Sequence, residues 1–247
     1  SNEFTSNGNV YTDVTQSLAL GGLTYGVTNM ELTAAYASIA NGGMYNKPVL
    51  YTKVVDQNGN VLLSNKPKKK QVMKSSTAFL LTDAMKDVIT KGTGKDAKLS
   101  SSMAAAGKTG TTSNNYDYWF SGYTPYHTAS VWMGYDNNTN FSSDNTHKKM
   151  WAKIMNAIIK TKNEKPKDFS KPSNIVKAKI CKESGKLAIK GVCDHDPRGN
   201  CVITEYFKKG TVPKQTCDTH VAVEICKKTD KLANKKCPKS ERIKKVY

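Results

Sequence analysis

Arginine and cysteine are absent from much of this 247-residue sequence: the first 149 residues contain no arginine, and the first 180 contain no cysteine. No apolar run approaches the roughly 20 residues that a membrane-spanning helix needs, so the sequence predicts neither a transmembrane segment nor a signal peptide. Hydrophobic residues make up 38% and charged residues 23%, which excludes a disordered, collagen-like or low-complexity chain. The length suffices for one large domain or two smaller ones.

The net charge of +18 is concentrated in the C-terminal part. Residues 150–247 carry 24 basic and 10 acidic residues, whereas residues 1–149 carry 14 lysines and 10 acidic residues. A surface of this sign favours a polyanion, and nucleic acid, anionic lipid headgroups and phosphate-bearing wall polymers all qualify on charge alone. Because no nucleic-acid-binding motif and no interleaved aromatic residues accompany the charge, we expect no nucleic acid partner.

All six cysteines lie in this basic part, which indicates a domain boundary ahead of them. The preceding residues 161–173 are polar, contain two prolines and lack apolar periodicity, as is typical of a linker. We therefore expect a first domain over residues 1–160 and a small cysteine-rich module over residues 174–247.

The first 160 residues show a mixed pattern of helices and strands. Thr28 and Glu31 have the spacing of a capping box, and Asn58-Gly59 suits a hairpin turn. Sequential strands on short connections are usually antiparallel neighbours, so the pattern predicts an α+β domain with helices packed on an antiparallel sheet. The expected helices cover residues 30–41, a segment capped by Ser75 or Ser76 and ending near Gly92, and residues 147–160; the expected strands cover residues 49–56, 61–64, 103–112, 116–123 and 127–135.

The most informative segment is Gly107-Lys108-Thr109-Gly110-Thr111-Thr112. A phosphate-binding P-loop would need a glycine five residues before Gly107, where Ser102 stands, and its Lys-Thr would open a helix rather than follow a strand. The P-loop is therefore excluded. The alternative is the Lys-Thr-Gly strand of penicillin-recognising serine acyltransferases.

The flanks of this strand resemble, in order and spacing, the class A penicillin-binding proteins. The resemblance extends from about residue 10 to residue 160, and the arginine-poor composition suits a low-GC Gram-positive source. The blocks that carry it are Gln16–Gly22, Tyr25–Thr28, Glu31–Tyr36, Ala40–Gly43, Pro48, Ala106–Thr112, Asp117–Pro125 and Val131–Asp136. In the tail, Gly210–Pro213, Cys217 and His220 resemble C-terminal extensions of clostridial class A enzymes.

The resemblance implies a D,D-transpeptidase with a serine β-lactamase-like sheet, which acts on D-Ala-D-Ala stem peptides of peptidoglycan and is acylated by β-lactams. It implies catalytic roles for Lys108, which reaches the serine of a Ser-x-Asn motif, and for Thr111, whose amide donates to the oxyanion. It implies a substrate site of Thr109, Gly110, Thr111 and Thr112, without metal or cofactor. It also implies a bifunctional parent with a glycosyltransferase domain, held at the extracytoplasmic face of the cell membrane by an anchor outside these residues.

One departure from the family pattern concerns the nucleophile. No Ser-x-x-Lys occurs in the 247 residues, and Ser113-Asn114-Asn115, which formally matches Ser-x-Asn, follows the Lys-Thr-Gly strand instead of preceding it. We interpret Ser113–Asn115 as a turn. We expect the missing motifs on an upstream segment or on a second chain that forms the N-terminal part of the same domain.

The cysteine-rich module contains an internal repeat, because residues 180–188 are echoed by residues 225–233 and each copy ends at a further cysteine. If each copy closes on itself, the bridges are Cys181–Cys193, Cys226–Cys237 and Cys201–Cys217. Zinc is the alternative, since Cys217 and His220 have ligand spacing, although no Cys-x-x-Cys occurs. We expect disulfides.

The four histidines, His127, His147, His195 and His220, show no acid partner at motif spacing, so we expect structural or solvent-facing roles for them. A second functional hypothesis takes the basic module as a non-catalytic cell-wall-binding domain.

Overall fold

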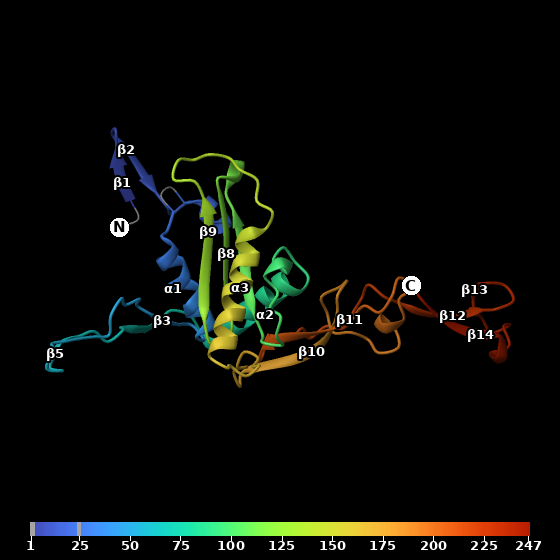
Figure 1. Cartoon of the computed structure of the whole chain (residues 1–247). Helices are drawn as coiled ribbons and strands as arrows, with labels where there is room; N and C mark the ends of the chain where they lie inside the picture. Colours follow the sequence, from blue (N-terminus) through green and yellow to red (C-terminus); the bar gives the residue numbers. More distant parts are fainter. Residues whose placement is uncertain (1–2, 24–25) are drawn as a thin grey trace. The chain divides into compact units, whose positions relative to one another are not determined.

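A computed structural model describes residues 3–23 and 26–247 of the chain, which separate into two units, Ser1–Ser170 and Lys171–Tyr247 (Figure 1). Tyr25, in one of the blocks that carry the resemblance, lies outside the described residues. The elements of the first unit are β1 (Glu3–Ser6), β2 (Asn9–Thr12), η1 (Gln16–Leu20), α1 (Asn29–Ala40), β3 (Met44–Asn46), β4 (Lys53–Val55), β5 (Val61–Ser64), β6 (Lys69–Gln71), α2 (Ser75–Thr90), η2 (Lys95–Ala97), β7 (Ala106–Thr111), η3 (Ser113–Asn115), β8 (Asp117–Tyr123), β9 (Thr128–Gly134) and α3 (Thr146–Thr161).

A three-stranded antiparallel sheet of order β7-β8-β9 forms the centre of the first unit. Its strands fall inside the three predicted segments, and helices pack on it, which confirms the α+β fold. In the register, Gly107 lies opposite Gly122, and Lys108 lies opposite Ser121. The short connections between these strands allow only neighbouring, antiparallel pairing.

The face of the sheet that carries Phe120 packs against α3. The rings of Phe120 and Trp151 meet edge to face with centroids 5.1 Å apart, and both side chains are fully buried. The Trp151 indole N–H donates to the carbonyl oxygen of Ala129, 3.0 Å away, so its one polar atom is satisfied inside the core. Val131 and Met155 complete this contact. Burial of the wide apolar face predicted for residues 147–160 therefore fixes α3 on the sheet.

The opposite face carries Tyr123, which packs with Tyr36 of α1 and Met85 of α2. Helix α1 begins as predicted: the Thr28 hydroxyl accepts the Glu31 amide at 3.2 Å, and the Glu31 carboxylate accepts the Thr28 amide at 2.9 Å. This capping box satisfies two amides that the helix cannot bond internally.

Two other local predictions have different outcomes. The hairpin β4–β5 is confirmed, with Gly59 at a φ of 83° in its turn. The cap predicted for α2 is wrong, because the helix begins at Ser75 with Lys74 in the capping position and no side-chain cap. Ser76 is buried inside the first turn of α2 and is not in a position to cap it.

Tyr123 predicts a specific loss of stability in alkali. Burial raises the pKa of this phenol to about 12, and its oxygen lies 2.8 Å from the Thr82 hydroxyl. In the unfolded chain a tyrosine has a pKa of about 10. Between pH 10 and pH 12 the folded protein therefore keeps the Tyr123 proton, whereas the unfolded chain has lost it. The contribution of Tyr123 to the free energy of unfolding is therefore fully present below pH 10 and is lost as the pH rises toward 12.

Across pH 10 to 12, the free energy of unfolding in urea should fall less steeply with pH for Tyr123→Phe than for wild type. Tyr126→Phe is the matched control, because the Tyr126 side chain is 42% exposed. Equal slopes for wild type and Tyr123→Phe would contradict the assignment.

Most of the predicted linker lies against the first unit. The Glu164 carboxylate contacts His127, the Lys167 carbonyl accepts the Ala104 amide at 3.1 Å, and Phe169 meets the Tyr123 ring edge to face. The division between the units falls after Ser170, nearer the end of the predicted linker than its start.

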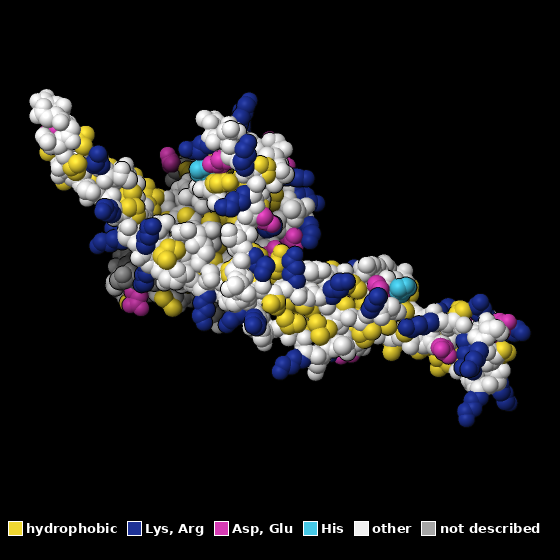
Figure 2. All heavy atoms as spheres, turned by 90° about the horizontal axis from the view of Figure 1, so that it is seen from below, with side chains coloured by type: hydrophobic (Ala, Val, Ile, Leu, Met, Phe, Trp, Pro, Cys, Tyr) yellow, Lys and Arg dark blue, Asp and Glu magenta, His cyan; other side chains and the backbone are white. Residues whose placement is uncertain are grey.

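The second unit is built from small antiparallel sheets, β10 with β11 and a three-stranded sheet of order β13-β12-β14. Figure 2 shows its lysine and arginine side chains spread along the visible face among hydrophobic ones. Among the residues that the structure describes, no helix in either unit has the length and hydrophobicity to cross a membrane. The elements of this unit are β10 (Ile175–Cys181), η4 (Cys193–His195), β11 (Val202–Lys208), β12 (Ala222–Cys226), β13 (Lys231–Leu232), η5 (Lys239–Glu241) and β14 (Arg242–Val246).

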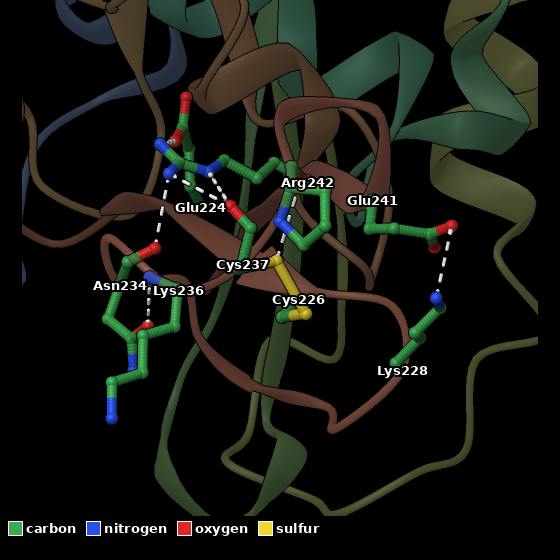
Figure 3. The surroundings of a disulfide bond; sticks show 9 residues. Glu224, Cys226, Lys228, Asn234, Lys236, Cys237, Glu241 and Arg242 are labelled. Atoms are coloured by element: carbon green, nitrogen blue, oxygen red, sulfur yellow. Dashed lines mark hydrogen bonds and ion pairs between the residues drawn. A yellow bond between two sulfur atoms is a disulfide. The ribbon is translucent and has the colours of Figure 1, made fainter.

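One of the three expected disulfides forms. Cys226 bonds to Cys237 with a Cα–Cα distance of 6.1 Å, and the Arg242 guanidinium donates to the Cys237 carbonyl at 3.0 Å (Figure 3). The expected bridges Cys181–Cys193 and Cys201–Cys217 do not form in the structure, where these four cysteines are buried and free. The two copies of the repeat therefore differ: the second closes on itself, and the first brings its cysteines to other partners.

Candidate active site

Strand β7 carries the Lys-Thr-Gly sequence at the edge of the central sheet. Within residues 3–23 and 26–247 it pairs with β8 alone, so the backbone on its other side has no strand partner. A side chain at Gly107 would place its Cβ 2.7 Å from Phe120 Cζ and 2.9 Å from the carbonyl oxygen of Ser121, a clash that only glycine avoids. Gly107 thus leaves room for the Phe120 ring and the β8 backbone beside β7.

An open pocket of about 830 Å³ lies along this strand. All five residues predicted for catalysis or substrate binding line it, namely Lys108, Thr109, Gly110, Thr111 and Thr112. The rest of the lining, which sequence reasoning missed, comes from η1, from α1, from β8 and from described residues of the segment between η1 and α1. Leu20, Tyr36 and Trp119 are among its large side chains. The η1 and α1 segments lie in blocks that resemble the family, and this resemblance is the sequence signal that could have placed them at the site. Burial raises the pKa of Tyr36, so its phenol is neutral at pH 7.

Lys108 is exposed and lies at the pocket rim. Its ammonium donates to the Thr109 carbonyl oxygen at 2.8 Å and to the Thr109 hydroxyl at 3.3 Å. The Thr109 hydroxyl also lies 2.9 Å from the Thr93 hydroxyl. An anion in the pocket would therefore meet a cation whose partners among the described residues are neutral.

A hydrogen-bonded chain holds the far end of β7. The Thr112 hydroxyl donates to one Asp117 oxygen at 3.0 Å, and the Trp132 indole N–H donates to the other at 2.7 Å. Sequence reasoning did not single out Asp117 or Trp132 for this role, although both lie in blocks that resemble the family. Ser113–Asn115 forms the turn that we expected, with Asn114 at a φ of 61°, and Ser113 does not line the pocket.

The histidines lie elsewhere. His127 contacts Glu164, His147 lies 3.2 Å from the Ser143 hydroxyl, and neither lines this pocket. His195 is in contact with Asp194. His220 is buried beside Cys217, its partner in the zinc alternative, and beside Cys181, which sequence reasoning did not pair with it.

Both units match models of known protein families. Residues 2–160 match the family model "Penicillin binding protein transpeptidase domain", and residues 171–222 match "Penicillin-binding protein 1A, C-terminal domain". Penicillin-binding protein 1A of Clostridium botulinum is 38% identical over 225 residues, which cover 90% of this chain and 27% of the relative. Penicillin-binding protein 1A/1B of Bacillus subtilis is 32% identical over 226 residues, which cover 84% of this chain and 24% of the relative.

The crystal structure of penicillin-binding protein 1A from Haemophilus influenzae shares the fold, with a TM-score of 0.63 and 24% identity over 82% of this chain and 35% of that one. The chain spans about a quarter of the length of the curated relatives it matches. Because the family model covers more than half of the chain, the chain belongs to the penicillin-binding protein transpeptidase family, among its class A members.

Proposed function

We propose that this chain supplies one wall of the active site of a peptidoglycan D,D-transpeptidase. The observation that carries the proposal is the position of Lys108-Thr109-Gly110-Thr111 on an unpaired strand edge that borders an open pocket. An extended stem peptide can add to such an edge as a further strand, with backbone hydrogen bonds supplying affinity. Peptidoglycan stem peptides and β-lactams are thus the proposed ligands.

The reaction is serine acyl transfer. The serine oxygen attacks the carbonyl carbon of the penultimate D-Ala, the peptide C–N bond breaks, and the terminal D-Ala leaves with the proton taken from the serine. An amine of a neighbouring peptidoglycan strand then attacks the ester carbonyl. The new C–N bond forms, the ester C–O bond breaks, and the proton from the amine returns to the serine oxygen. Since these 247 residues contain no Ser-x-x-Lys, we assign the nucleophile, its lysine and the Ser-x-Asn motif to another segment or chain of the same domain.

The residues of β7 have separate roles in this proposal. The Lys108 ammonium keeps the pocket positive and reaches the Ser-x-Asn serine, and the Thr109 and Thr111 hydroxyls bond the terminal carboxylate. The Thr111 amide donates to the oxyanion together with the amide of the nucleophile. Gly110 allows close approach of the substrate backbone, since it carries no side chain. We place the whole protein at the extracytoplasmic face of the membrane, with an anchor and a glycosyltransferase domain outside these residues.

A fluorescent penicillin tests the proposal directly. When this chain and the polypeptide with Ser-x-x-Lys are produced together as separate chains, the label should appear on the partner and leave this chain dark in a denaturing gel. The reason is that the ester forms on a serine that this chain does not carry. Fluorescence on the 247-residue chain would contradict the assignment.

A further inference from the structure

The core of the second unit consists largely of cysteine. Its cluster of buried residues is Cys181, Cys193, Cys201 and Cys217, surrounded by partly buried Ala188, Ile189 and Val202. Thiols of this size bury little apolar area, and a unit of 77 residues with such a core needs a further source of stability. The Cys226–Cys237 bridge lies outside this cluster and does not supply it.

Three of these thiols converge on one histidine. Cys181, Cys193, Cys217 and His220 are at most 5% exposed, and their ligand atoms all lie within 4.8 Å of one another. His220 Nδ1 lies 3.4 Å from Cys181 Sγ and 3.3 Å from Cys217 Sγ. A tetrahedral zinc with bonds of about 2.3 Å to sulfur and about 2.0 Å to nitrogen separates a sulfur from a nitrogen by about 3.5 Å and two sulfurs by about 3.8 Å.

The groups around His220 hold its ring in the orientation that a metal ligand requires. His220 Nε2 lies 2.6 Å from Asp196 Oδ2, so the ring donates there and leaves the lone pair of Nδ1 toward the sulfurs. The Arg198 guanidinium binds the same carboxylate through two nitrogens, at 2.9 and 3.1 Å, and fixes it. The Ile189 amide donates to Cys193 Sγ at 3.2 Å, which stabilises a sulfur anion.

We propose that Cys181, Cys193, Cys217 and His220 bind one structural Zn²⁺, with Asp196 as the residue that orients His220. The metal joins the end of β10, the η4 turn and the 217–220 segment through their side chains. The backbone links the same segments, because Leu187 bridges to both Ile180 and Thr216 and the Cys201 amide donates to the Cys193 carbonyl oxygen at 2.9 Å. Binding replaces three S–H bonds with three Zn–S bonds and releases three protons to solvent, without an oxidant or a reductant. The site lies within the residues that match the penicillin-binding protein 1A C-terminal domain, and no comparison assigns a metal there.

Cys201 differs from the three ligand cysteines. Its sulfur donates to the Gly199 carbonyl oxygen at 3.4 Å, as a protonated thiol does. Asp196, Cys201 and His220 also lie within 4.8 Å of one another, but Arg198 and His220 Nε2 already occupy the Asp196 carboxylate. The set of three sulfurs and one nitrogen is the one that suits zinc.

Metal and thiol content of the wild-type chain give the first test. The 247-residue chain, purified without chelator, should contain one zinc by atomic emission, and denaturation in chelator should expose four free thiols. The zinc-depleted chain, refilled with cobalt, should show thiolate-to-cobalt charge-transfer and tetrahedral d–d bands. A zinc-free chain in which peptide mapping recovers Cys181 with Cys193 and Cys201 with Cys217 would overturn the proposal.

Two matched serine variants give the second test. In competition with a chromophoric chelator, Cys217→Ser should bind zinc at least 100-fold more weakly, whereas Cys201→Ser should keep the wild-type affinity and one zinc per chain. Asp196→Asn should weaken zinc binding about 10- to 100-fold, because Asp196 orients the ligand His220 without touching the metal. Equal loss of zinc affinity in Cys201→Ser and Cys217→Ser would show that Cys201 holds the metal as much as Cys217 does, and would overturn the assigned ligand set. If Cys217→Ser fails to fold, the cobalt spectrum of the wild type decides, and absence of the charge-transfer band excludes the site.

Discussion

Lys108→Ala is expected to slow acylation by penicillin about 30- to 1,000-fold in the enzyme formed by this chain and the segment with the serine. The ammonium lines the pocket, and its hydrogen bonds among the described residues go to the Thr109 carbonyl and hydroxyl, which are neutral. In the proposed function it stabilises the charge that develops on the substrate. Loss of one such positioned group costs about 2–4 kcal/mol of transition-state stabilisation, which corresponds to a rate about 30- to 1,000-fold slower. The measurement is the second-order acylation rate from stopped-flow or quenched labelling.

The control for this prediction separates catalysis from folding. Lys53→Ala removes an exposed lysine on β4, which does not line the pocket, and should leave the acylation rate within about twofold. The thermal midpoint of Lys108→Ala should match that of wild type, since the side chain fills no core. An acylation rate within twofold of wild type for Lys108→Ala would remove the lysine from the mechanism.

Met155→Ala is expected to lower the free energy of unfolding of the first unit by about 2–5 kcal/mol. Met155 is fully buried in the contact between α3 and the sheet, and truncation leaves a cavity that packed neighbours only partly fill. All three tryptophans, Trp119, Trp132 and Trp151, lie in the first unit, so urea unfolding followed by tryptophan fluorescence reports on that unit alone.

The matched control lies on the same helix. Met150 is 50% exposed, so Met150→Ala changes the same chemical group in the same helix without opening a cavity, and its cost should stay within about 0.5 kcal/mol. Similar costs for the two variants would show that α3 packs on the sheet through a different face.

The sequence predicted those parts of the fold that short-range chemistry controls. The capping box of Thr28 and Glu31 and the turn at Gly59 each depend on residues within four positions of one another, and both form. The residue pattern predicted a strand over residues 103–112, and β7 lies within it. Its role in the site came from the resemblance over many ordered blocks, because Lys-Thr-Gly alone is too short to identify a family. The start of α2 was misplaced by one or two residues, because Ser75 and Ser76 each suit a cap in the sequence. In the folded chain Lys74 takes the capping position, and Ser76 is buried inside the first turn.

The cysteines show what local pattern leaves out. The repeat predicted that each copy closes on itself, and this holds for Cys226 and Cys237, which are 11 residues apart. The two cysteines of the first copy, Cys181 and Cys193, lie at a similar separation in the sequence. The folded chain instead brings His220 and Cys217 to Cys181 from about 40 positions away. Asp196, which orients His220, gives no sequence signal, because its contact with the ring exists only after that long-range approach.

The open edge of β7 also affects how the protein behaves in concentrated solution. A strand with an unpaired row of amides and carbonyls is a template for any extended chain, including the same strand of a second copy. Lys108 projects from this strand and is exposed, so antiparallel pairing of two copies would bring positive charges together and discourage aggregation. High salt, which screens that repulsion, should therefore make the isolated chain more prone to self-association. The side chain proposed to act on substrate would thus also favour colloidal stability.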